Sequence, residues 1–123
     1  NKAMPIDEKL KIANEISSFR LNSFRLNHEI SLKFFVHIQK ITSKNNIKTI
    51  FIDLPRDILS VEAYKPINDN YLDALKVLKK RSHIENWSNS KNFTSEDFYD
   101  LDHLLPKKRY ELSNNIINLI NQN

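Results

Sequence analysis

KTIFIDLPRD, residues 48–57, is the stretch of sequence that decides the fold. Its first part, 48–53, is rich in β-branched and aromatic side chains and is too short for a stable helix. The run directly follows a long helical pattern, as a strand does in a parallel sheet. Pro55 ends it. We therefore expect a buried strand, with Asp53 and Arg56 at its carboxyl end, the edge at which open α/β sheets bind ligands.

Helical periodicity surrounds this strand on both sides. Apolar side chains recur at steps of three and four residues through 5–19, 28–44 and 70–81, and again after Pro106. Pro106 suits the first turn of a helix, because an amide hydrogen at that position would have no partner within the helix. These patterns predict four helices.

Three further segments complete the predicted order. The pentapeptide SFRLN occurs twice in tandem, at 18–22 and 23–27, and a period of five is compatible with a continuing helix or with a bent connection. We predict a loop at 57–67 and a second short strand at HIENWS, 83–88.

The order helix–helix–strand–helix–strand–loop–helix predicts an α/β fold, a three-layer flavodoxin-like parallel sheet with flanking helices. Two strands are too few for a self-sufficient sheet of that kind. We therefore expect 1–123 to be a single domain or domain fragment, with a helical segment at 1–27 and the C-terminal half of the α/β domain after it.

The composition supports the view that this is part of a larger unit. The chain contains no glycine and no cysteine. Without glycine there is no phosphate-binding loop, dinucleotide fingerprint or G-x-S-x-G elbow, and without cysteine there is no thiolate metal site or cysteine nucleophile. The chain also starts at Asn1 and not at Met. We expect a processed product or a fragment, with part of the catalytic apparatus outside the chain.

The charge is mildly basic, with a formal net value of +4. The bases form short clusters at 79–81 and 107–109, which we interpret as solvated helix faces. No nucleic-acid-binding signature accompanies them, so we expect no nucleic-acid partner. No apolar run approaches the ~20 residues of a membrane-spanning helix, and no signal peptide is visible.

The strongest candidates for catalytic residues lie in DFYDLDHLLPKKRYELS, 97–113, where Asp100 precedes His103 by three residues. Residues three apart share one face of a helical turn, so the carboxylate can accept the Nδ1 hydrogen of the imidazole and orient it as a base. The ordinary alternative is a carboxylate that interacts with a helix N-terminus. Asp102 is adjacent to His103 and points elsewhere. Three ligands within four residues cannot all face one ion, so we expect no metal.

The segment FYDLDHLLPKKRYELSNNIINLI, 98–120, resembles the C-terminal block of SGNH hydrolases, the GDSL esterase/lipase superfamily. The shared pattern is an aromatic residue, Asp-x-x-His, an apolar–Pro turn and a closing helix. KTIFIDLPRD is similar to the strand and post-strand proline upstream of that block. The resemblance covers 28–121 and implies that Asp100 is the triad acid and His103 the triad base. The family's Gly-Asp-Ser block has no counterpart here, which implies a nucleophilic serine in a missing N-terminal half.

Other polar side chains have weaker claims to a function. Asp53 and Arg56 are candidates for substrate contacts, beside the ordinary alternative of a surface ion pair. We expect His28 and His37 to be surface or boundary groups on helices and His83 to open a strand.

The resemblance implies a serine esterase or O-acyltransferase that acts on an O-acyl ester, carried by an envelope glycan or a lipid. The compartment is not determined by the residues, although longer relatives of this type favour the cell envelope. The alternative, from another functional class, is a non-catalytic α/β or helical module that binds a protein partner through an apolar helix face.

Overall fold

The structure, a computed structural model, describes residues 2–88 and 92–122. This part of the chain is mostly helical and contains one small parallel sheet of two strands. The elements are α1 (Ile6–Glu15), the π-helical η1 (Ile16–Arg20), α2 (Leu21–Lys44), β1 (Ile50–Asp53), α3 (Ile58–Tyr64), the 3₁₀ segment η2 (Lys65–Ile67), α4 (Asn68–Lys79), β2 (His83–Asn86), the 3₁₀ segment η3 (Ser95–Asp97) and α5 (Pro106–Gln122).

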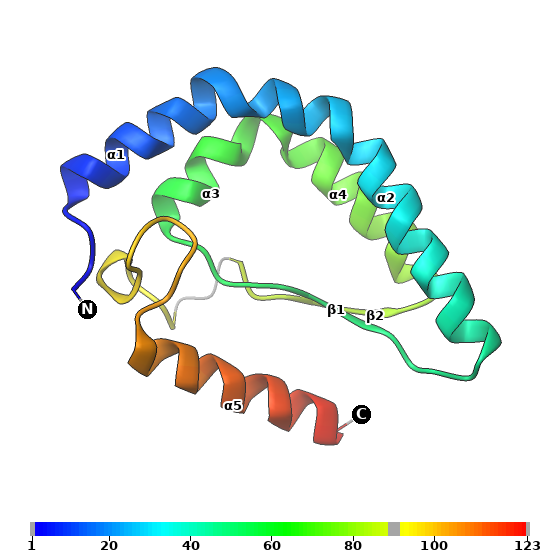
Figure 1. The fold of residues 1–123 in the computed structure, drawn as a ribbon. Coiled ribbons are helices and arrows are strands. Elements are labelled where there is room, and N and C mark those ends of the chain that lie inside the picture. The colour runs from blue at the N-terminus through cyan, green and yellow to red at the C-terminus, as the bar shows by residue number, and fades with distance from the viewer. Residues whose placement is uncertain (1, 89–91, 123) are drawn as a thin grey trace.

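Helices α1 and α2 form one arched helical run, with η1 as the joint between them (Figure 1). The wider π turn keeps Ile16 and Leu21, five residues apart, on the same inner side, where both are buried in one cluster with Ala13. The tandem repeat at 18–27 is therefore a continuing helix and not a bent connection. For the same reason α2 begins well before the helix expected at 28–44.

Both expected strands are present, and they pair in parallel. The expectation of a buried strand over 48–53 is wrong in part, because β1 begins at Ile50 and its four residues are only partly buried in this narrow sheet. The register runs from Ile50 opposite His83 to Asp53 opposite Asn86. One further backbone hydrogen bond, from the N–H of Trp87 to the carbonyl of Asp53 (2.9 Å), extends the ladder at its carboxyl end. A parallel pair requires a crossover connection, which α3, η2 and α4 provide.

Helices lie on both faces of this pair, with α2 and α4 on one side and α5 on the other (Figure 1). The alternation of side chains along β1 explains the arrangement. Phe51 packs edge-to-face on Phe35 of α2 at 5.5 Å between ring centres, while Ile50 shares a cavity on the opposite face with Leu119 and Ile120 of α5. The α/β character is present, but the two-stranded sheet is much narrower than that of a flavodoxin-like domain.

The prediction of a loop at 57–67 is wrong, because this segment is α3 followed by η2. Asp57 caps α3 by accepting the backbone N–H of Leu59 (3.0 Å). Helix α3 has seven residues, too few to show a helical period in sequence, and it is stabilised by burial of Ser60 and Ala63. The other crossover helix, α4, begins slightly before the expected segment, and α5 begins at Pro106 as predicted.

A buried ion pair joins three distant parts of the chain. The ammonium group of Lys9, on α1, lies 2.8 Å from a carboxylate oxygen of Asp57, with the side chains 1% and 0% exposed. The same group donates to the carbonyl oxygens of Ser95 (2.5 Å) and Phe98 (3.1 Å). The hydroxyl of Ser95 donates to Asp57 at 2.6 Å. The network therefore connects α1, the start of α3 and the segment made of η3 and Phe98 to one another.

We predict that Lys9→Met lowers the free energy of unfolding by about 3–5 kcal/mol, because it leaves the carboxylate of Asp57 buried without its counter-charge. Urea denaturation followed by circular dichroism measures the change. Lys11→Met, at an exposed position on the same helix, is the matched control and changes the value by no more than about 0.5 kcal/mol. Equal effects of the two variants would contradict a structural role for the ion pair.

Candidate functional site

The loop that carries Asp100 and His103 is closed by backbone pairing. Phe98 and Leu104 form an isolated antiparallel bridge, and both side chains are buried. Inside the bridge the N–H of Tyr99 donates to the carbonyl of His103 at 2.7 Å. The apolar residues on either side of the tip therefore hold the two candidate residues in one tight turn.

The underside of the loop is anchored on α3. Leu101 is buried in the core, and its carbonyl accepts the N–H of Asp57 at 2.9 Å. The carboxylate of Asp102 accepts the hydroxyl of Ser60 at 2.9 Å, so it points away from His103, as expected. Within 2–88 and 92–122, no group of three or more His, Asp and Glu side chains could hold a metal ion.

Asp100 and His103 meet directly. The Nδ1 atom of His103 lies 2.9 Å and 2.8 Å from the two carboxylate oxygens of Asp100. One of these oxygens also accepts the backbone N–H groups of Asp102 (2.9 Å) and of His103 itself (2.8 Å). A carboxylate can only accept when ionised, so Nδ1 carries the hydrogen in this contact. In the neutral ring, Nε2 is then left as the basic nitrogen.

The expected origin of this contact is wrong, although the contact itself is present. Residues 99–103 are not a helical turn, and α5 begins only at Pro106. The pair is formed by a side-chain-to-backbone turn in which Asp100 caps the next residues, a local pattern that Asp adopts readily. Since α5 starts three residues after His103, the alternative of a carboxylate seated on a helix N-terminus does not describe Asp100.

Opposing influences set the pKa of Asp100. Partial burial raises it, but the hydrogen bonds from the Asp102 backbone, the His103 ring and the His103 backbone, together with the charge of the imidazolium, outweigh burial. The net result is a pKa below the ordinary value of 3.8. Asp100 therefore remains a carboxylate across the neutral range and can stabilise a positive charge on His103.

The imidazole stands at the surface, beside a small cavity. The side chain of His103 is 78% exposed, whereas that of Asp100 is 26% exposed. The cavity has a volume of about 160 Å³, and Tyr99, Leu104, Leu105, Pro106 and Arg109 line it beside His103. A reacting group can thus reach the ring from solvent while the carboxylate behind it is held in place by the loop.

Asp53 and Arg56 form a second cluster. The guanidinium lies 3.5 Å from the Asp53 carboxylate, and both side chains are partly buried. Asp53 also accepts the phenol of Tyr71 at 2.5 Å. Burial and this hydrogen bond raise the pKa of Tyr71 well above its ordinary value of 10.0, so the phenol keeps its proton. Neither Asp53 nor Arg56 lines the cavity beside His103.

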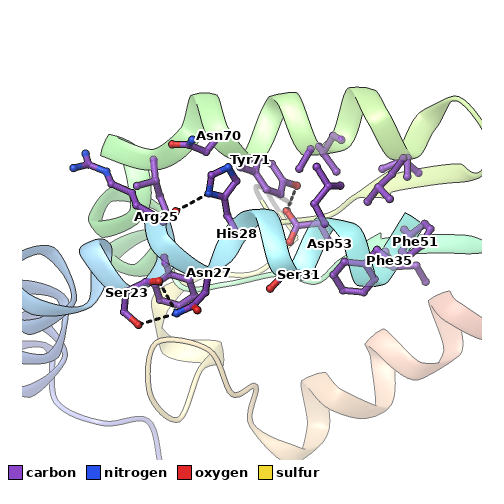
Figure 2. A pocket seen from close by; sticks show the side chains of 18 residues that line it. Ser23, Arg25, Asn27, His28, Ser31, Phe35, Phe51, Asp53, Asn70 and Tyr71 are labelled. Carbon is purple, nitrogen blue, oxygen red and sulfur yellow. Dashed lines mark hydrogen bonds between the residues drawn. The ribbon is translucent and has the colours of Figure 1, made fainter. Parts of the chain in front are cut away.

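Asp53 and Tyr71 belong instead to a large apolar groove between α2, α4 and β1 (Figure 2). Its volume is about 520 Å³, within the range of ~300–1,000 Å³ that is typical of ligand pockets. His28 lines the groove and is half-buried, which agrees with a boundary position. The apolar stripes of 28–44 and 70–81 were visible in sequence, but periodicity alone does not show that their side chains leave a gap.

No family model, no curated protein and no solved structure matches this chain. None of the helices in the described residues is both long and apolar enough to cross a membrane.

The lowered pKa of Asp100 makes a testable contribution to stability. In the unfolded chain the carboxyl titrates near 3.8, and in the folded chain it titrates lower. Its contribution is complete above the unfolded value and is lost as the pH falls through the folded value. We predict that Asp100→Asn, which has no titrating group, shows a smaller loss of unfolding free energy than the parent between about pH 5 and pH 2.

Urea denaturation at a series of pH values measures this dependence. Asp73→Asn is the matched control, since Asp73 also pairs with a cation three residues away but its side chain is 74% exposed. The control is expected to follow the parent curve. An Asp100→Asn curve parallel to that of the parent would show that the loop does not lower the pKa of Asp100.

Proposed function

We propose that this chain contributes the Asp100–His103 pair of a serine esterase or O-acyltransferase of SGNH type. The proposal rests on one observation: the Nδ1 side of an exposed imidazole is held at 2.8–2.9 Å by a carboxylate that is itself anchored by two backbone N–H groups. This is the arrangement that orients a histidine as a general base.

The fold that we propose for the complete domain is a three-layer, flavodoxin-like α/β sheet, of which this chain is the C-terminal half. Helices on both faces of the parallel pair β1–β2 support it. The missing half would add further strands and the nucleophilic serine. The catalytic site that we propose is the Asp100–His103 pair, in the loop before the last helix. We assign Asp53 and Arg56 a secondary role in substrate contact.

The proposed reaction is ordinary acyl transfer through serine. The serine hydroxyl attacks the ester carbonyl while Nε2 of His103 removes its proton, and Asp100 stabilises the imidazolium. The tetrahedral intermediate collapses as His103 returns the proton to the leaving alcohol, and an acyl-serine remains. Water or an acceptor hydroxyl then attacks this ester, with His103 again taking the proton. The bond between the acyl group and the serine oxygen breaks as His103 returns the proton to that oxygen, which releases the acid or the new ester and restores the serine. No metal or organic cofactor takes part.

The substrate class that we propose is an O-acyl ester on a glycan or a lipid, with the cell envelope as the favoured place of action. The cavity beside His103 supports an ester with an apolar portion, because Tyr99, Leu104, Leu105 and Pro106 line it.

A non-catalytic interaction module is the second candidate, and one observation favours it. Large apolar side chains, each at least half exposed, recur at steps of four and seven residues along the arch of η1 and α2: Phe19, Leu26, Ile30, Phe34 and Ile41. None of them lines the groove. An exposed stripe of this kind is typical of protein-binding helices.

Labelling with a fluorophosphonate, which reacts with activated serines, separates the two candidates. We predict that the natural full-length protein is labelled and that His103→Ala and Asp100→Asn lower the labelling rate by about a hundredfold or more. His83→Ala is the matched control, because His83 also contacts a carboxylate, that of Glu85 at 2.5 Å, but lies on β2. It is expected to label as the parent does.

An unlabelled parent, or labelling that is the same in the parent and in both site variants, would overturn the enzyme proposal and favour the module. Circular dichroism spectra of each variant show whether a loss of labelling reflects unfolding instead.

A further inference from the structure

The large groove has a polar end and an apolar end. His28 and Asn70 lie at the end nearer the start of α2, while Phe35 and Phe51 close the other end (Figure 2). Between them the walls are mainly aliphatic, from Leu32 on α2, Leu75 and Leu78 on α4, and Ile84 on β2. The hydrogen-bonded pair of Tyr71 and Asp53 also lies between the two ends (Figure 2). A lining of this kind matches a ligand that is itself polar at one end and apolar along its length.

His28 gives the polar end a defined hydrogen-bonding character. Its Nδ1 atom lies 2.7 Å from the backbone carbonyl of Arg25. A carbonyl oxygen only accepts, so Nδ1 is the donor in this contact. The Nε2 atom of the neutral ring is therefore an acceptor, and the hydroxyl of a ligand can donate to it.

The charges of the groove favour an uncharged head group. Asp53 is the carboxylate that lines the groove, and it is already engaged by the phenol of Tyr71 and by Arg56. The Asp53 carboxylate would repel an anionic head group, and its charge is already compensated by Arg56, so it does not favour a cationic one. The other ionised group in the lining, Arg25, is exposed, and its side chain extends away from His28 (Figure 2).

We propose that this groove binds a single-chain amphiphile, with its alkyl or acyl chain between α2 and α4 and its uncharged, hydroxyl-bearing head at Nε2 of His28. The volume of about 520 Å³ accommodates one such chain in a pocket of ordinary ligand-binding size. This inference does not rest on the proposed acyl transfer, since His103 lies outside the groove.

Isothermal titration calorimetry with octanol, decanol and dodecanol, and with the matching carboxylates, tests the proposal. Burial of the chain predicts that the affinity for the alcohols rises by roughly fourfold per added methylene until the groove is full. At equal chain length the carboxylate is expected to bind more weakly than the alcohol. Affinity that does not change with chain length, or a preference for the carboxylate, would overturn the proposal.

Variants locate the binding site. Ala74→Phe places a ring inside the groove and is expected to abolish binding, whereas Val77→Phe, on the same helix but outside the lining, keeps it. Ser31→Phe is a second blocking variant, because Ser31 lines the groove but is itself exposed, so the substitution does not disturb a buried position. If Ala74→Phe and Ser31→Phe, shown to be folded by their melting curves, bind as the parent does, the chain does not occupy this groove.

The head contact has its own test. His28→Phe keeps the size of the ring but removes the acceptor, and it is expected to weaken alcohol binding by about twofold to tenfold, the usual effect of one hydrogen bond. His37→Phe, on the exposed side of the same helix, is the control. Equal affinities of these two variants for decanol would refute the assignment of the head group to His28.

Discussion

The buried contact between Lys9 and Asp57 is the constraint on which the rest of the structure depends. Both side chains are almost completely removed from water, and such charges are tolerated only when they are paired and hydrogen-bonded. Here the ammonium group has the carboxylate and the carbonyls of Ser95 and Phe98, and the carboxylate also caps α3. Because the four residues come from three separate segments, the network forms only when α1, the start of α3 and the segment Ser95–Phe98 are assembled together.

That assembly positions the candidate active site. The loop from Phe98 to Leu104 is held from below by the ion pair and by the contacts of Leu101 and Asp102 with α3. Its tip is then free to present His103 to solvent while Asp100 stays partly covered. In the proposed enzyme, the contacts beneath the loop would keep His103 oriented as a general base without burying it. The large groove lies on another side of the molecule and has a separate lining, so the two surfaces can act independently.

Much of the secondary structure could be predicted from local patterns. The first strand, within 48–53, follows from a run of β-branched and aromatic residues, and the helix that begins at Pro106 follows from proline chemistry. Both signals act within a few residues. The segment at 57–67 was mistaken for a loop because α3 is short and depends on burial of Ser60 and Ala63 by residues far away in sequence. The π turn of η1 was not predicted for a similar reason, because it is stabilised by the burial of Ile16 and Leu21 in a common core.

In the candidate site, too, some features follow from local sequence and others depend on the tertiary structure. The residues Asp100 and His103, three apart, were sufficient to predict a carboxylate–imidazole contact, because that contact needs only a local turn. The type of turn, the cover over Asp100, the cavity beside His103 and the whole of the groove were decided by tertiary structure. Spacing along the chain determines which side chains can meet, whereas burial, cavities and charge compensation depend on segments that are brought together only when the chain folds.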